Sequence, residues 1–149
     1  MTADLAETTE CLCLASRRAA RAITRKFDRA LRPKGLRATQ FTLLASLEMK
    51  GPQPIGALAD FIGVERTTLT RNLAVAEKEG LVTMSSGPDA RSHNASITAQ
   101  GRRTVKFAFA AWRATQDDLT GAIGTAAAEG LKKLSREPSV RNTSRENLP

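Results

Sequence analysis

The chain has 149 residues, of which 41% are hydrophobic, so it can bury one core but is too short for two large domains. Lys and Arg outnumber Asp and Glu by 23 to 15, and the net charge of +8 favours polyanionic partners, nucleic acid above all. No apolar run approaches the roughly 18 residues of a membrane-spanning helix, and the acidic N-terminal sequence is unlike a signal peptide, so we expect a cytoplasmic protein with no membrane partner.

The first predicted element is a long amphipathic helix over residues 12–31. Its apolar residues recur at helical spacing, while several arginines crowd the opposite side. Pro33 cannot continue the hydrogen-bond ladder and Gly35 tolerates a turn, so the helix is expected to end before them.

Three shorter helices are predicted next. The second helix has Thr39 as a plausible N-cap and ends at Gly51. The third begins at Pro54, a residue suited to the first helical position, and ends at Gly63. The fourth lies within "GVERTTLTRNLAVAEKEGLV", residues 63–82, and has no good capping residue at its start.

A β-hairpin follows Gly80, where the apolar period changes from helical to alternating. Residues 81–86 and 95–98 are the strand candidates, and the turn formers of "GPDARSHN" lie near the tip. A fifth helix opens at Thr98 and runs toward Leu119.

A weaker sixth helix spans residues 126–134, and it is rich in alanine. Residues 135–149 contain almost no apolar side chains, so we expect a flexible tail.

Short helices followed by a hairpin are the pattern of a winged helix-turn-helix, whose last short helix lies in the DNA major groove. If Leu69, Leu73 and Ala76 form the buried stripe of the fourth helix, a rotation of about 100° per residue turns a polar set outward. Arginine can bind guanine through two hydrogen bonds, threonine can contact a base, and lysine can neutralise a phosphate. The outward set consists of Thr67, Thr68, Thr70, Arg71, Ala74 and Lys78.

The hairpin tip contains a second candidate DNA contact. Asp89 lies two residues before Arg91, so its carboxylate can brace a guanidinium that enters a minor groove. The alternative for the fourth helix is an ordinary solvated face, and the alternative for the hairpin tip is an exposed arginine in a polar turn.

A sequence-neutral architectural DNA-binding protein is the alternative function. It would share the charge and the wing, but it would show no operator preference.

These residues resemble the MarR family of bacterial transcriptional regulators. The matching stretches are "RPKGLRATQFTLLASL", "IGALADFIGVERTTLTRNLAVAEKEGLV" and "DARSHNASITAQGRRTV", together with the flanking long helices. The resemblance implies a triangular homodimer on a pseudo-palindromic operator in double-stranded DNA. It also implies recognition-helix contacts from Thr67, Thr68, Thr70, Arg71 and Asn72, and a wing pair of Asp89 and Arg91.

The predicted fold is therefore mainly α with a small β-hairpin wing, a winged helix-turn-helix with N- and C-terminal dimerisation helices. Residues 1–134 form one MarR-like domain, in which residues 37–98 are the DNA-binding lobe. The dimerisation helices are residues 8–33 and 99–134, whose apolar stripes have little else in so small a chain to cover them. Two recognition helices would then lie about 34 Å apart, one turn of B-DNA.

Cys11 and Cys13 are candidates for a redox signal. On a helix they would point about 200° apart, which disfavours a mutual disulfide and leaves one free to be buried and one exposed. Cys13 has the spacing of the reactive cysteine in the OhrR subgroup of the family, although this chain has no tyrosine to hold the thiolate, and Phe27 and Arg17 stand where hydroxyls are expected. The cationic Arg17 can favour the reactive thiolate, whereas a helix cysteine that only packs is the alternative.

A small-molecule effector is the other candidate signal. The resemblance implies that an anionic or aromatic molecule binds between the long helices and the DNA-binding lobe, and Arg17, Arg21 and Trp112 are candidate lining residues. Each is also a candidate for an ordinary surface or packing role.

An enzymatic function has little support. The one histidine, His93, falls in the wing, and there is neither a nucleophile-elbow serine nor a carboxylate cluster with metal-ligand spacing. We therefore expect no enzyme activity, no cofactor and no metal site. The predicted function is a homodimeric repressor that cysteine oxidation or an effector releases from DNA.

Overall fold

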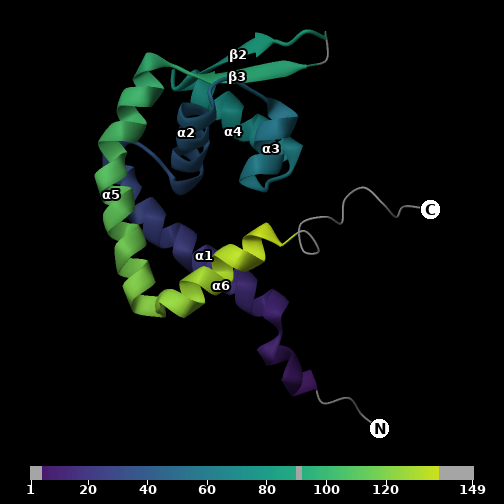
Figure 1. Ribbon diagram of the computed structural model, residues 1–149, viewed down its shortest axis with the longest axis vertical. Coiled ribbons are helices and arrows are strands. Elements are labelled where there is room, and N and C mark those ends of the chain that lie inside the picture. The colour runs from purple at the N-terminus through teal and green to yellow at the C-terminus, as the bar shows by residue number, and fades with distance from the viewer. Residues whose placement is uncertain (1–4, 90–91, 138–149) are drawn as a thin grey trace, which may run out of the picture.

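The computed structural model describes residues 5–89 and 92–137. A winged lobe forms one end of the molecule, and the long helices form the other (Figure 1). Its helical elements are η1 (Leu5–Glu10), α1 (Leu12–Leu31), η2 (Arg32–Lys34), α2 (Ala38–Lys50), α3 (Ile55–Ile62), α4 (Arg66–Lys78), α5 (Ala99–Ile123) and α6 (Thr125–Arg136). Its strands are β1 (Gln53–Pro54), β2 (Val82–Ser86) and β3 (His93–Ile97).

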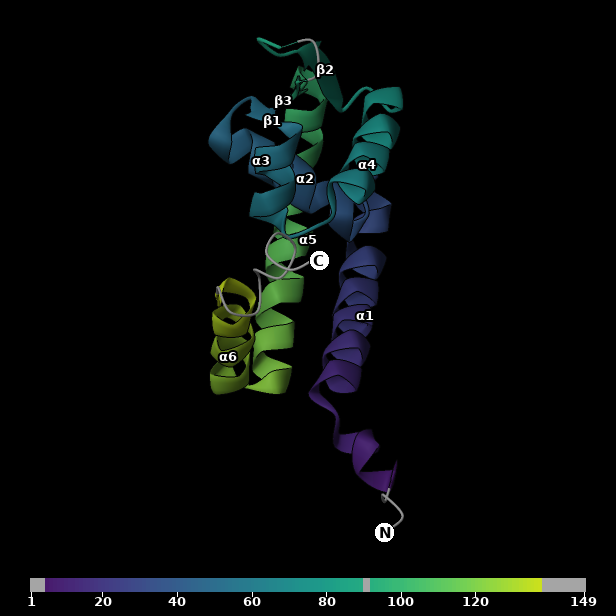
Figure 2. The ribbon, with the colours of Figure 1, turned by 90° about the vertical axis from the view of Figure 1, so that its right-hand side faces the viewer.

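The helix α5 connects the two ends of the molecule. It packs against α1, α2 and α6 and runs the length of the body beside them (Figure 2). The N-terminal η1 projects away from the body, and none of its residues is buried (Figure 2). The predicted mainly helical fold with a hairpin wing is confirmed.

One hydrophobic core holds the winged lobe to the long helices. Leucines of α1, α2, α3 and α4 supply most of it, and Ala95 of β3 and Ala108 of α5 close it. Burying such side chains contributes roughly 1.5–3 kcal/mol each, so this contact fixes the orientation of α4. The leucines are Leu31, Leu43, Leu44, Leu47, Leu58, Leu69 and Leu73, each at most 1% exposed.

The sheet has one strand more than the sequence predicts. β3 lies between β1 and β2 and is antiparallel to both, with Gln53 opposite Ala95 and Met84 opposite Ala95 on the other side. Pro54 belongs to β1 and precedes α3 rather than opening it, which corrects the expected helix start. Proline has no backbone N–H group to donate. It is tolerated there because β1 is an edge strand, so one side of it has no neighbouring strand to accept a hydrogen bond.

The start of α2 also differs from the prediction. The helix begins at Ala38, so Thr39 lies inside it and is not its N-cap. The carboxylate Oδ1 of Asp28, on α1, accepts a hydrogen bond of 2.8 Å from the Ala38 N–H. This cap from another helix satisfies one free N–H group, and the Gln40 side-chain oxygen accepts a 2.9 Å hydrogen bond from the Arg37 N–H as a local cap.

The C-terminal helices are longer than predicted. Thr98 caps α5 by accepting a 2.9 Å hydrogen bond from the Gly101 N–H, as expected, and α5 continues to Ile123. Gly124, with φ 84°, separates it from α6. Since α6 extends to Arg136, the expected tail begins later than residue 135, and residues 138–149 lie outside the described part of the chain.

Candidate nucleic-acid interface

The helix α4 is positioned by one buried stripe, as predicted. Leu69 and Leu73 are each 1% exposed and Ala76 is fully buried. Gly63, with φ 79°, makes the left-handed turn that joins α3 to α4, a conformation that other residues adopt at a cost. The turn and the stripe together determine which side of α4 faces outward.

The outward side of α4 carries the predicted hydroxyls and cations. Thr67, Thr68, Thr70, Arg71 and Lys78 are all exposed. The Thr70 hydroxyl donates a 2.8 Å hydrogen bond to the Arg66 carbonyl, which leaves its methyl group and the oxygen lone pairs for an outside contact. The Arg71 guanidinium has no ion-pair partner among the described residues.

Asn72 is placed differently from the other predicted recognition residues. It is half-buried and lines a cavity beneath α4 rather than the outward side. The resemblance assigned it by position in the motif, whereas its rotation about the helix axis turns it toward α1.

Arg66 and Val75 are exposed residues of α4 that the sequence reasoning missed, as is Glu77. Arg66 is the first residue of the helix, and Val75 is 51% exposed on the flank near Arg71. The helical rotation that selected Thr67 and Arg71 also turns Val75 outward, and the uncertain helix start hid Arg66.

The far end of α4 is fastened to its neighbours by polar contacts. Glu79 accepts a 2.6 Å hydrogen bond from the Gln40 amide of α2. Glu77 accepts a 3.1 Å hydrogen bond from the Met84 N–H of β2. These contacts link the recognition helix to the lobe and to the wing.

The tip of the wing is described only in part. Asp89 is exposed, and its backbone carbonyl accepts hydrogen bonds from both the N–H (2.9 Å) and the hydroxyl (3.0 Å) of Ser92. Gly87 is required here, because a Cβ atom would lie 2.1 Å from the Ser92 hydroxyl oxygen. Arg91, the predicted minor-groove residue, lies outside the described residues.

Both cysteines are exposed in the single chain, so neither packs inside it. Cys11 is the N-cap of α1 in an extended conformation, so the two do not share a helix as assumed. Cys13 lies in the first turn and Arg17 one turn later, both exposed on α1. In the single chain, solutes such as peroxides can therefore reach either thiol.

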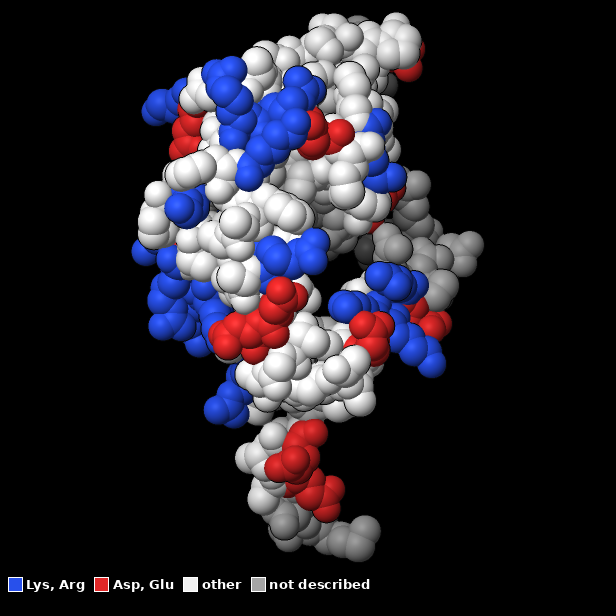
Figure 3. Space-filling model, turned by 60° about the vertical axis from the view of Figure 1, so that its left-hand side comes forward, with Lys and Arg blue, Asp and Glu red and all other residues white. Residues whose placement is uncertain are grey.

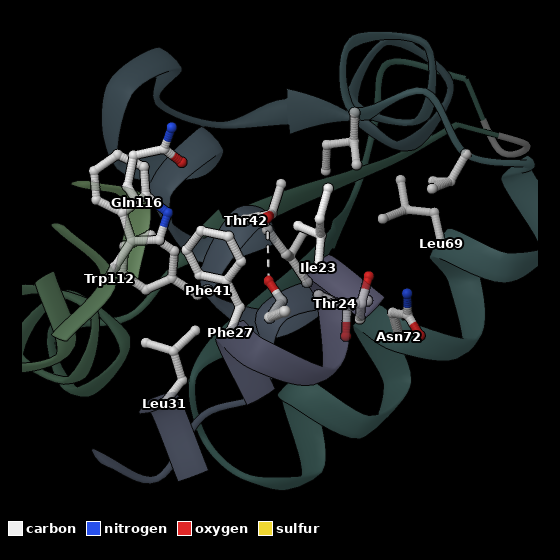
Figure 4. Close-up of a pocket in the computed structure, with 15 residues that line it drawn as sticks. Ile23, Thr24, Phe27, Leu31, Phe41, Thr42, Leu69, Asn72, Trp112 and Gln116 are labelled. Carbon is white, nitrogen blue, oxygen red and sulfur yellow. Dashed lines mark hydrogen bonds between the residues drawn. The ribbon is translucent and has the colours of Figure 1, made fainter. Parts of the chain in front are cut away.

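A cavity of about 380 Å³ lies where α1 to α5 meet (Figure 4). Trp112 lines it, as predicted, and its ring stacks on Phe41 with centroids 5.6 Å apart. Arg17 and Arg21, the other two candidate effector contacts, are not among its lining residues; both lie exposed on α1. They lie toward the free end of α1, at least two residues before its first lining residue, Ile23.

Basic side chains also mark the face that includes α5. Lys and Arg lie in several patches over its upper half and middle, with acidic side chains among them, and further acidic residues lie on the N-terminal segment at the bottom (Figure 3). Glu48 of α2 pairs with Arg102 at 2.6 Å and Lys106 at 3.5 Å, tying α2 to α5. The Arg102 hydrogen bond is the main reason why the pKa of Glu48 is lowered, and the charges of both cations add to it.

No metal-binding group of three or more His, Cys, Asp or Glu residues occurs within residues 5–89 and 92–137. None of the helices in that part of the chain combines the length and the apolarity needed to cross a membrane.

Comparison with known proteins identifies the family. The model of the MarR family matches residues 36–93, which contain α2 to β2 and the start of β3. The crystal structure of the M. tuberculosis transcriptional regulator MosR in complex with DNA is 39% identical, with a TM-score of 0.79 over 89% of this chain and 99% of that one. This chain belongs to the MarR family.

Two further relatives agree with this assignment. The transcriptional repressor CouR bound to a 23-mer DNA duplex is 26% identical, with a TM-score of 0.73 over 90% of this chain and 96% of that one. The HTH-type transcriptional regulator YwoH of Bacillus subtilis (strain 168) is 30% identical over 84 residues, 56% of this chain and 61% of that protein. The chain thus matches less than two thirds of YwoH. Because the MarR family and these relatives are transcriptional regulators, the prediction that the chain is not an enzyme is confirmed.

Proposed function

We propose that this protein is a homodimeric repressor that binds a pseudo-palindromic operator in double-stranded DNA and leaves it in response to a chemical signal. The observation that carries the proposal is the outward side of α4, where Thr67, Thr68 and Arg71 are exposed opposite a fully buried stripe. Side chains of these types read base edges in the major groove. MosR and CouR, which are similar to this chain, have both been solved with DNA.

Dimerisation is supported by apolar side chains that the single chain leaves uncovered. Leu12 of α1 is 85% exposed, and Leu131 and Leu134 of α6 are 46% and 49% exposed. Ala128 is the one buried residue of α6, which has its main contact with α5. A second copy that covered these helices would remove this apolar surface from water and place two winged lobes side by side. Residues 8–33 and 99–134 are the proposed dimer contacts, and residues 37–98 the DNA-binding lobe.

Two signals are compatible with the structure. In the first, the Cys13 thiolate attacks a peroxide oxygen, forming an S–O bond as the O–O bond breaks and hydroxide leaves. In the second, a small molecule occupies the cavity beneath α4. CouR, 25% identical to this chain, has been solved bound to p-coumaroyl-CoA, which supports effector control.

A footprint on the DNA flanking the gene tests the proposal. A protected site with two half-sites one helical turn apart is the expected result, and sedimentation should give the mass of a dimer. Protection that spreads evenly over any duplex would instead favour a sequence-neutral architectural protein.

Repeating the footprint with hydrogen peroxide separates the two signals. Release that disappears in Cys13→Ser but persists in Cys11→Ser assigns the sensor to Cys13. Equal release in wild type and Cys13→Ser removes Cys13 as the sensor, whereas a wild-type protein that peroxide does not release leaves the effector as the signal.

A further inference from the structure

Val75 is an apolar side chain on the recognition helix that the single chain leaves uncovered. It is 51% exposed, and no other large hydrophobic side chain of α4 is exposed. In the described part of the chain, the other exposed large hydrophobic residues lie on η1, α1, α5 and α6, or on α2 and α3. The proposed dimer contacts, residues 8–33 and 99–134, do not include α4, so a second copy seated there would leave Val75 open.

Val75 continues the row of outward side chains that contains the proposed base contacts. At about 100° per residue, Thr68, Arg71 and Val75 lie within about 60° of one another around the helix axis, and all three are exposed. Because helical side chains lean toward the preceding turn, the Val75 methyl groups lie over the turn that carries Arg71. From Thr68 to Val75 the helix rises only about 10 Å, so the row can contact successive base pairs within one major groove, which is about 12 Å wide.

The carboxylates at this end of the helix are held to the sides of the row. Glu77 accepts its 3.1 Å hydrogen bond from the wing backbone, and Glu79 accepts its 2.6 Å hydrogen bond from an amide of α2. The outward side therefore offers hydroxyls, cations and, at Ala74 and Val75, methyl groups. Among the unmodified bases only thymine presents a methyl group in the major groove, where apolar side chains can contact it.

We propose that Val75 contacts the C5-methyl group of a thymine next to the guanine that Arg71 binds, and that this contact helps to set the operator sequence. The inference rests on the proposed function, because it names a further specificity-determining residue of the same interface. Burying apolar surface against this methyl group favours thymine over cytosine, which has no methyl group at that position.

Uracil scanning of the operator tests the contact, because uracil differs from thymine only in lacking the C5-methyl group. Each thymine of the footprinted site is replaced in turn, and the affinity of the full-length protein is measured by fluorescence anisotropy. One position in each half-site should lose roughly fourfold in affinity, the effect of one methyl group that is no longer buried. Placing 5-methylcytosine rather than cytosine at that position should raise affinity by a similar factor, because it returns the methyl group.

The Val75→Ala variant assigns the effect to this side chain. It should bind the thymine and uracil operators with the same affinity, and its melting temperature should match wild type because Val75 is half-exposed. Met49→Ala is the matched control, since Met49 is 72% exposed on α2, outside the recognition helix, and this variant should keep the full uracil effect. Measuring each variant on both duplexes cancels any change that uracil makes to the duplex itself.

A footprinted operator in which no thymine methyl group affects binding overturns the proposal. So does a uracil effect of wild-type size in a folded Val75→Ala variant. A missing footprint would count against the operator-binding function itself, so the two failures are distinguishable.

Discussion

Replacing Arg71 with alanine tests the assigned orientation of α4. The side chain is exposed and has no ion-pair partner among the described residues, so its removal costs the fold little. One bidentate contact with a guanine contributes about 1–3 kcal/mol of discrimination. At about 1.4 kcal/mol per factor of ten, each half-site should lose about 5- to 140-fold in operator affinity.

The loss should be confined to the specific complex. Fluorescence anisotropy with the footprinted operator and with a scrambled duplex separates base reading from general attraction to phosphate. Arg103→Ala is the charge-matched control, because Arg103 is an exposed cation of α5 rather than of the recognition helix and has no ion-pair partner in the described part of the chain. It should lower both affinities slightly and leave their ratio unchanged.

An Arg71→Ala protein with the wild-type ratio of operator to scrambled affinity would refute the assignment of this side of α4 to the major groove. A lower melting temperature in the same variant would point instead to a structural contact of Arg71.

The remaining predictions concern the wing, the core and the link between α2 and α5. Arg91→Ala should weaken binding evenly across sequences, measured as a parallel loss on operator and scrambled duplexes; a change confined to the operator would contradict it. Leu73→Ala should lower the free energy of unfolding by about 2–5 kcal/mol in urea titrations, because Leu73 is 1% exposed, and a smaller loss would mean that the core re-closes. Because pairing lowers the pKa of Glu48 in the folded protein, the stabilisation from its ion pairs is fully present above the pKa that Glu48 has in the unfolded chain. This stabilisation is lost as the pH falls through the lower pKa of Glu48 in the folded protein. The melting temperature of Glu48→Gln should therefore fall less than that of wild type as the pH is lowered. A variant with the same pH profile as wild type would count against this link.

The sequence alone determined the helices and the outward side of α4. Apolar residues at helical spacing are a local property, so residues 12–31 were predicted with the bounds that α1 has in the structure. The same periodicity placed Leu69, Leu73 and Ala76 inside and Arg71 outside.

Only the tertiary structure decided features that join distant parts of the chain. Asp28 caps α2 across ten residues, and β1 pairs with β3 across about forty, so no local pattern signals either contact. The buried Gly101 is explained in the same way, since a Cβ atom there would lie 2.1 Å from the carbonyl oxygen of Leu81, in the turn before β2.

The cavity beneath α4 also depends on the tertiary structure. Residues of five helices line it. That none of these lining residues is charged can be seen only once the helices are packed together. Periodicity in the sequence of a helix predicts the direction in which each side chain points from the helix axis. Which residues that side chain then contacts depends on the helices packed against it. For this reason the motif placed Asn72 with the DNA contacts, whereas the packing of α4 against α2 and α3 turns it into the cavity.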